Sequence, residues 1–278
     1  MTDYAYPEVL IDTQWLAKHL NDSKVRIVEV ERSPKSDKNA HAHIPGAVFW
    51  SITDLMLPDL QINLEVNAIE KLLSQSGITN ETTIVPYSSE PGIGGFIFWL
   101  LKLFGHQDIR VLNGGHQKWM SEGHPVTAEL SSFPPTEYKA KPIDKSLRVL
   151  HREVQLSIGC PDTVILDVRT IQEYQGQHFL MKPPEGSERA GHIPSSIHIE
   201  HILTLNEDGT FKSFDELQML YSSHGITSDR EVFPYCAVGG RSGFVWFVLK
   251  YLLGYPKVRN YDGSWNEWSS LSNVPIEK

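Results

Sequence analysis

The chain has few cysteines, no long apolar segment and a deficit of positive charge. Its two cysteines, Cys160 and Cys236, are too few for a disulfide-stapled scaffold in 278 residues, so we expect a reducing, cytoplasmic setting. No apolar run reaches the roughly 18 residues that a membrane span requires. The first residues show no basic segment followed by an apolar one, so we expect neither membrane insertion nor a secretory signal.

The charge balance excludes two classes of partner. The chain carries 25 Lys and Arg against 34 Asp and Glu, a formal net charge of −9. Nucleic acids and anionic membranes bind to basic surfaces, so we expect neither as a partner. A small anionic substrate remains compatible, because backbone N–H groups and one or two local cations can bind it in a pocket. The 40% of hydrophobic residues suffices for ordinary folded domains.

The two halves of the chain repeat each other. Four blocks return in the same order at offsets of 148 or 149 residues: 41–48 as 190–197, 84–87 as 232–235, 95–102 as 243–250, and 113–119 as 262–268. An offset this long predicts two tandem copies of one domain, residues 1–130 and 148–278. The Pro-rich, polar stretch 131–147 between them is typical of an exposed linker.

Each copy alternates short β-rich runs with helical patterns. This alternation predicts an α/β fold in which each copy has a parallel sheet flanked by helices. In the second copy, the apolar runs at 164–168 and 231–235 predict buried parallel strands, whose carboxyl ends face a site in such folds. We expect the next helix over 242–253.

The segment after the second of these strands combines the features of a site for a thiolate and an anion. Its residues are Cys236, Ala237, Val238, Gly239, Gly240, Arg241 and Ser242. The two glycines allow loop N–H groups to turn inward. Those groups, the helix N-terminus and Arg241 all favour negative charge on the Cys236 sulfur. A buried structural thiol is the alternative, which this combination of residues makes the weaker interpretation.

The first copy lacks the functional groups of this segment. Ser88 stands in place of Cys236, and Ile93 in place of Arg241. We therefore expect the first copy to be non-catalytic and to act as a partner domain that covers or completes the site of the second.

These features resemble the rhodaneses, the thiosulfate:cyanide sulfurtransferases, in their two-domain bacterial form. The resemblance covers about residues 6–276 and includes the segments LDVR (166–169), RAGHIP (189–194), NEDGTFKS (206–213) and NYDGSW (260–265). It implies that Cys236 attacks the outer sulfur of a donor such as thiosulfate, releases sulfite, and passes the persulfide sulfur to cyanide or a thiol. It also implies that Arg241 orients an anionic substrate, that Ser242 caps the loop or donates to the leaving anion, and that no cofactor is needed.

The sequence departs from the family pattern, which leaves alternatives open. Bacterial relatives usually carry Arg at the position of Ala237, Glu at that of Gly240, and Ser-His at Gly243-Phe244. Relatives that use 3-mercaptopyruvate typically have an arginine at the position of Glu173 and a different cysteine loop, so that donor stays an alternative. A non-catalytic rhodanese-fold binding module is another. A cysteine-dependent phosphatase is less favoured, because its loop has five residues between Cys and Arg and this one has four.

Several other polar residues have candidate roles. Asp167 and Arg169 end a strand near the expected site, where they either form a supporting ion pair or contact substrate. Arg189 is placed to reach the cleft between the copies and bind an anion. His43 and His192 recur in both copies beside Ile-Pro, so we expect them to fix a loop through hydrogen bonds. No carboxylate or thiol cluster accompanies the histidines at ligand spacing, so we expect no metal.

Overall fold

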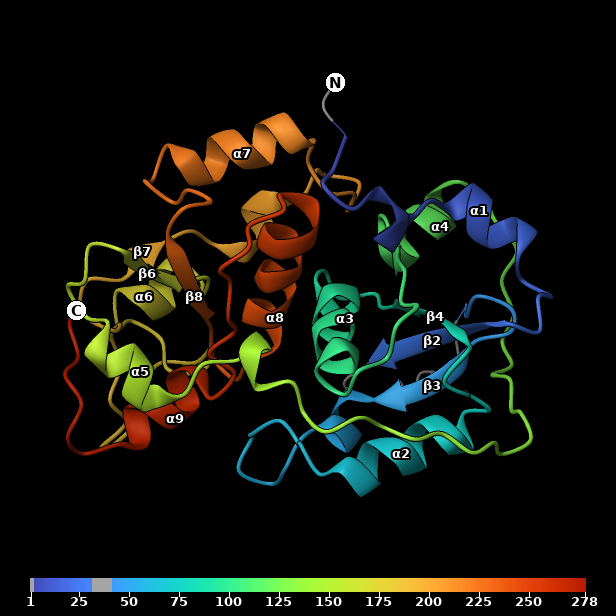
Figure 1. Cartoon of the computed structure of the whole chain (residues 1–278), viewed down its shortest axis with the longest axis horizontal. Helices are drawn as coiled ribbons and strands as arrows, with labels where there is room; N and C mark the ends of the chain where they lie inside the picture. Colours follow the sequence, from blue (N-terminus) through green and yellow to red (C-terminus); the bar gives the residue numbers. More distant parts are fainter. Residues whose placement is uncertain (1–2, 32–41) are drawn as a thin grey trace.

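The computed structural model describes residues 3–31 and 42–278, and these form two α/β domains in tandem (Figure 1). The N-terminal domain has a parallel sheet in the order β3-β2-β4, and the C-terminal domain one in the order β7-β6-β8. The strands are β1 (Leu10–Ile11), β2 (Val25–Glu31), β3 (Val48–Ser51), β4 (Thr83–Tyr87), β5 (Val111–Leu112), β6 (Thr163–Asp167), β7 (Ile197–His198) and β8 (Glu231–Tyr235). The expected α/β class with parallel sheets is confirmed.

Short helices flank these sheets. They are α1 (Thr13–Lys18), α2 (Val66–Gln75), α3 (Ile93–Leu103), α4 (Gly115–Ser121), α5 (His151–Leu156), α6 (Ile171–Tyr174), α7 (Phe214–Ser222), α8 (Gly240–Phe247) and α9 (Ser264–Ser270). The helix expected over 242–253 begins two residues earlier, and its last turn, Val248–Leu252, is π-helical. The site helix α8 thus starts directly at the glycines of the cysteine loop.

The internal repeat is visible in the strand register. β2 pairs with β4 so that Val28 lies opposite Pro86, and β6 pairs with β8 so that Leu166 lies opposite Pro234. All seven residues of β2 are buried, as are the last four of β6, which is typical of parallel strands covered on both faces. The repeat block 41–48 begins at residue 41, which lies outside the described residues.

The domains pack against each other through α3 and α8, which lie side by side at the centre of the molecule (Figure 1). A Cβ atom on Gly95 of α3 would come within 2.8 Å of the Phe244 ring, and one on Gly243 of α8 within 3.2 Å of the Phe96 ring. Each helix therefore places a phenylalanine on a glycine of the other. Close packing between the domains accounts for a glycine at 243 and a phenylalanine at 244.

The segment joining the domains is exposed over most of its length, as the sequence predicted for residues 131–147, and contacts the N-terminal domain at a few points. It runs as an extended strap across α2 in Figure 1, and Tyr138 within it is only 1% exposed. The Thr136 N–H donates to the Ser74 carbonyl at 3.0 Å. The Arg26 guanidinium lies 3.2 Å from the centre of the Phe133 ring. Tyr138 is the buried residue of this stretch, and the exposure that the composition indicates holds for most of the other positions.

Candidate active site

Cys236 lies at the end of β8, at the base of a loop that leads into α8. Its side chain is 1% exposed. The Gly239 N–H donates to Sγ at 3.2 Å, and the Ser242 hydroxyl lies 3.6 Å from Sγ while donating to the Gly239 carbonyl at 3.1 Å. The Gly239 N–H stabilises negative charge on the sulfur, and the Ser242 hydroxyl does so when its one proton turns from the Gly239 carbonyl to Sγ. Val238 and Gly240 are the partly exposed residues of this loop, whereas Ala237 is buried.

Gly239 is the residue that the loop geometry requires. Its φ is +93°, in the left-handed region, and a Cβ atom there would lie 2.6 Å from the Asp262 carbonyl oxygen. A side chain is excluded both by this contact and by the backbone conformation. The glycine is therefore what turns an N–H group toward the Cys236 sulfur.

Arg241 stands at the start of α8 and is held by a buried carboxylate. Its guanidinium donates two hydrogen bonds to Glu173, at 2.8 and 2.9 Å, and the Glu173 side chain is 0% exposed. Burial alone would raise the pKa of Glu173, but the hydrogen bonds and charge of Arg241 hold that pKa below its ordinary value. The bonds to Glu173 and the nearby charge of Cys236 outweigh burial and raise the pKa of Arg241. The cation of the site is thus fixed in place and paired.

Glu173 was not among the predicted site residues, except as a position where relatives carry arginine. Thr170 and Glu173 form a capping box at the start of α6, with the Thr170 hydroxyl 3.0 Å from the Glu173 carboxylate. That pattern is readable in the sequence as a helix start. The partnership with Arg241 joins residues 68 positions apart, and no local signal reveals it.

Ser264 is a second residue that sequence reasoning missed. Its hydroxyl accepts the Cys236 N–H at 3.0 Å, donates to the Tyr261 carbonyl at 2.8 Å, and lies 3.9 Å from the Cys236 Sγ. Its φ is +53°, which is costly for serine, and the equivalent residue of the first copy is Gly115, also at +53°. The signal in the sequence is the comparison of the two copies, because serine at 264 replaces the glycine at 115 in a repeated block.

His201 contacts the site from the 3-10 turn His201–Thr204 that follows β7. Its Nδ1 lies 3.3 Å from the Val168 carbonyl, and its ring meets the Phe244 ring edge-on. Burial, helped by the positive charge of Arg241, lowers the pKa of His201 to about 4. The imidazole is therefore neutral at neutral pH and adds no second cation beside Arg241.

Asp167 and Arg169 form a fully buried ion pair behind the loop. Both side chains are 0% exposed, with Nε of Arg169 2.9 Å from the Asp167 carboxylate. The Tyr235 hydroxyl donates to Asp167 at 2.6 Å, and Arg169 donates to the Gly191 carbonyl at 2.7 Å. These contacts support the interpretation of a pair that holds the strand ends together, because all of them are made within the domain interior.

Arg189 does not lie with the other site residues. Its guanidinium donates to the backbone carbonyls of Leu271 and, at 2.7 Å, Val274, in the segment after α9. The expectation that it faces the cleft between the domains is therefore wrong, because these carbonyls of its own domain hold it. His192 is likewise part of the scaffold, with Nδ1 2.9 Å from the Tyr174 carbonyl.

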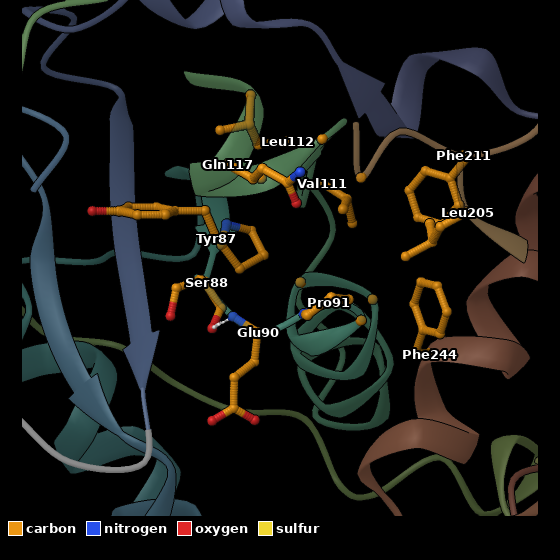
Figure 2. Close-up of a pocket in the computed structure, with 18 residues that line it drawn as sticks. Tyr87, Ser88, Glu90, Pro91, Val111, Leu112, Gln117, Leu205, Phe211 and Phe244 are labelled. Carbon is orange, nitrogen blue, oxygen red and sulfur yellow. Dashed lines mark hydrogen bonds between the residues drawn. The ribbon is translucent and has the colours of Figure 1, made fainter. Parts of the chain in front are cut away.

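The equivalent loop of the first copy binds an anion of its own. The Glu31 carboxylate accepts the Ser89 N–H at 2.6 Å and the Ser88 hydroxyl at 3.2 Å. Figure 2 shows a pocket at this loop, closed on its far side by Leu205, Phe211 and Phe244 of the C-terminal domain. The first copy thus keeps the position of the site, with a carboxylate of the chain bonded to the loop.

Two classes of feature are absent from the part of the chain that the structure describes. Residues 3–31 and 42–278 contain no group of three or more His, Cys, Asp or Glu side chains placed to hold a metal ion. Among the same residues, no helix has the length and apolar character needed to cross a membrane. Cys160 and Cys236 are both free thiols.

With this geometry in view, comparison with known proteins decides the family. The Rhodanese-like domain matches residues 12–122 and again residues 150–271. The chain belongs to the rhodanese family. The two matched segments coincide with the two sheets, so the tandem arrangement expected from the repeat is confirmed.

Two relatives span almost the whole of this rhodanese. The Thermus thermophilus protein named Sulfur carrier protein TtuD is 43% identical, over 99% of this chain and 98% of its own. A Mycolicibacterium smegmatis protein with the provisional name thiosulfate sulfurtransferase is 40% identical, over 98% of this chain and 99% of its own. These names support the general class that the sequence predicted, a rhodanese-fold sulfurtransferase.

Solved structures agree on the fold, and one of them is described as a cysteine persulfide. The anaerobic ergothioneine biosynthesis enzyme of Chlorobium limicola, bound to trimethyl histidine, has a TM-score of 0.84 and 26% identity, covering 100% of this chain and 72% of that one. A variant of the enzyme EanB, described as a cysteine persulfide with ergothioneine, also has a TM-score of 0.84, with 25% identity and the same coverage. A persulfide is thus seen in a neighbour of this rhodanese.

Proposed function

We propose that this protein moves a sulfur atom from thiosulfate, or a related small donor, to cyanide or a thiol through a persulfide on Cys236. The observation that carries the proposal is the environment of Sγ, which faces the Gly239 N–H and the Ser242 hydroxyl beside the fixed cation of Arg241. A persulfide anion is stabilised by such donors and needs no general base. Few cysteines and the reaction itself fit a reducing, cytoplasmic setting.

Each step balances without a cofactor. The Cys236 thiolate attacks the outer sulfur of thiosulfate, the S–S bond of the donor breaks, and sulfite leaves with the bonding electron pair. The outer sulfur of the resulting persulfide is then attacked by cyanide or a thiolate, which forms thiocyanate or a new persulfide and returns the Cys236 thiolate. Arg241 and the loop donors act in both steps, because each carries negative charge at the same sulfur atoms.

The charge of the site affects which donor it favours. Glu173 neutralises Arg241, and Ala237 supplies no cation beside the cysteine. Binding of the thiosulfate dianion therefore depends on N–H dipoles and the start of α8 rather than on net positive charge. A donor of lower charge, such as an alkyl persulfide, fits this balance better. Glu173 also stands where relatives that use 3-mercaptopyruvate typically have an arginine, so this chain lacks that cation for the carboxylate of 3-mercaptopyruvate.

Weighing the intact protein after incubation with donors tests the proposal. We expect the wild-type chain and Cys160→Ser to gain one sulfur from thiosulfate or an alkyl persulfide, and Cys236→Ser to gain none. A donor panel scored by rate, with 3-mercaptopyruvate included, then ranks the donors. No sulfur from any donor would favour the binding module, and hydrolysis of p-nitrophenyl phosphate without sulfur gain would favour a phosphatase.

A further inference from the structure

Each domain carries a short hairpin that reaches the loop region of the other domain. In the N-terminal domain, Met56 bridges Ile62, and in the C-terminal domain, Leu205 bridges Phe211. The two pairs are related by the same 149-residue offset as the sequence repeat. We call residues 56–62 the N-hairpin and residues 205–211 the C-hairpin.

The N-hairpin lies on the loop that holds Cys236. A Cβ atom on Gly239 would come within 2.8 Å of the Ile62 side chain, so this side chain packs directly on the residue that donates to Sγ. One hydrogen bond, from the Asn266 side chain to the Asp59 carbonyl at 2.8 Å, ties the N-hairpin to α9. Among the described residues, no other hydrogen bond or ion pair joins the N-hairpin to the C-terminal domain.

The C-hairpin is tied to the N-terminal domain at more points. Gln117, which is equivalent to Asn266, donates to the Glu207 carbonyl at 3.1 Å. In addition, the Phe211 N–H donates to the Asn113 side chain at 2.9 Å, and Lys118 forms an ion pair with Asp208 at 2.9 Å. The C-hairpin packs at the first-copy loop, and Figure 2 shows its Leu205 and Phe211 facing that pocket.

The residues at the equivalent positions beside the N-hairpin cannot make the last two of these contacts, the hydrogen bond from Phe211 and the ion pair of Lys118. Glu267 stands where the other side has Lys118, and Asp59 where it has Asp208, so two acids replace an ion pair. Asp262 stands in place of Asn113, but both of its carboxylate oxygens accept hydrogen bonds from Arg148, at 2.9 and 2.8 Å.

Backbone conformation adds to the contrast between the hairpins. Leu60 at the tip of the N-hairpin has a φ of +64° and is 47% exposed, whereas the equivalent residue of the C-hairpin is Gly209, with a φ of +80°. A leucine in the left-handed region is strained, and a glycine is not. The N-hairpin is therefore held less stably than the C-hairpin, because of both its backbone conformation and its fewer contacts.

A donor can reach Cys236 only if a segment that covers the thiol moves away. The thiol is 1% exposed, yet the proposed reaction, on which this inference rests, needs a donor and an acceptor to reach Sγ in turn. Phe96, the other N-terminal-domain side chain on the loop glycines, sits in the rigid α3–α8 contact and is 1% exposed. We propose that the N-hairpin is the gate of the Cys236 site, opened by breaking the Asn266–Asp59 bond and lifting Ile62 off Gly239.

Alkylation of Cys236 measures this gate without any sulfur transfer. In a Cys160→Ser background, the rates for iodoacetamide and for a bulky fluorescent iodoacetamide are followed by intact mass. Their ratio cancels changes in thiolate content and reports how wide the gate opens, because iodoacetamide needs a smaller opening than the bulky reagent. Loss of one hydrogen bond predicts that Asn266→Ala raises the bulky-to-small ratio about fivefold. The matched control Gln117→Ala, on the C-hairpin, should leave the ratio unchanged.

A second variant moves the gate in the opposite direction. Glu267→Lys places a lysine opposite Asp59, as Lys118 is opposite Asp208, and should lower the ratio several-fold. Equal ratios for Asn266→Ala, Glu267→Lys and Gln117→Ala, with unchanged thermal unfolding, would overturn the gate even if sulfur transfer is normal. The expected changes in a protein that acquires no sulfur would support the gate and refute the proposed function instead.

Discussion

The two loops at the ends of β4 and β8 occupy the same place in their domains and bind different anions. In the first copy, the Glu31 carboxylate accepts the Ser89 N–H at 2.6 Å. In the second, the Cys236 sulfur accepts the Gly239 N–H at 3.2 Å, and the nearby carboxylate of Glu173 is turned to Arg241. The fold thus supplies an anion-binding loop. The side chains around the loop decide whether it can hold a persulfide sulfur that is passed on to an acceptor.

The largest expected effect comes from removing Arg241, the cation that the second loop has and the first loop lacks. Arg241→Ala leaves the Glu173 carboxylate buried and unpaired. The variant loop then has no cation at this position, like the first loop with its Ile93. We expect the substitution to lower the free energy of unfolding by about 3–5 kcal/mol and sulfur transfer by roughly 100-fold. Urea unfolding and single-turnover rates measure the two losses.

The double variant Arg241→Met/Glu173→Met separates stability from chemistry. It removes both charges together, so most of the stability should return while sulfur transfer stays low. Recovery of transfer in the double variant would show that the cation has no part in the reaction. A single variant Arg241→Ala as stable as the wild type would contradict the burial of the pair.

The next effect in size is a pH dependence from His201, a histidine that the first copy lacks at the equivalent position. Burial lowers the pKa of His201 to about 4, and the first copy has Ile52 at the equivalent position. In the unfolded chain the His201 imidazole binds a proton near pH 6.5, whereas in the folded chain it does so only near pH 4. The contribution of His201 is therefore complete above pH 6.5 and is lost as the pH falls toward 4, by roughly 3 kcal/mol.

Substitution by the residue of the first copy tests this assignment. Urea unfolding of the wild type and of His201→Ile at pH 7, 5.5 and 4 should show a steeper loss of stability in the wild type. His224→Ile, on an exposed helix end, is the matched control and should follow the wild-type curve. Parallel curves for all three proteins would exclude His201 as the source.

A smaller change is expected at the strained serine behind Cys236. Ser264→Gly introduces the residue that the first copy has at the same φ of +53°. Relief of backbone strain offsets the lost hydrogen bonds, so we expect the free energy of unfolding to change by less than about 1 kcal/mol. Sulfur transfer should fall about tenfold, because the hydroxyl no longer fixes the Cys236 N–H.

The reverse change in the first copy is its control. Gly115→Ser adds the hydroxyl and the strain where no cysteine stands, so it should destabilise the fold by about 1 kcal/mol and leave sulfur transfer unchanged. An unchanged transfer rate in Ser264→Gly would mean that the serine serves the fold alone.

Sequence patterns predicted the parts of the molecule that are local or repeated. The repeat gave two domains, the apolar runs gave β6 and β8, and the Cys-Gly-Gly-Arg spacing gave the loop with Arg241 at the start of α8. Partners that come from distant segments escaped prediction. Glu173 meets Arg241 only in the folded chain, Arg189 turns to the carbonyls after α9, and Tyr138 buries its side chain within a linker that is otherwise mostly exposed.

The smallest expected effect is none at all, in a variant that gives the first loop its nucleophile. Ser88→Cys in a Cys236→Ser background puts a thiol at the equivalent strand end, next to the Glu31 carboxylate that already accepts the Ser89 N–H. A thiolate there would face a carboxylate and no arginine, because Ile93 replaces Arg241. We therefore expect no sulfur gain from any donor by intact mass. A measurable persulfide on this cysteine would show that the fold alone, without Arg241 and its loop donors, is sufficient for the chemistry.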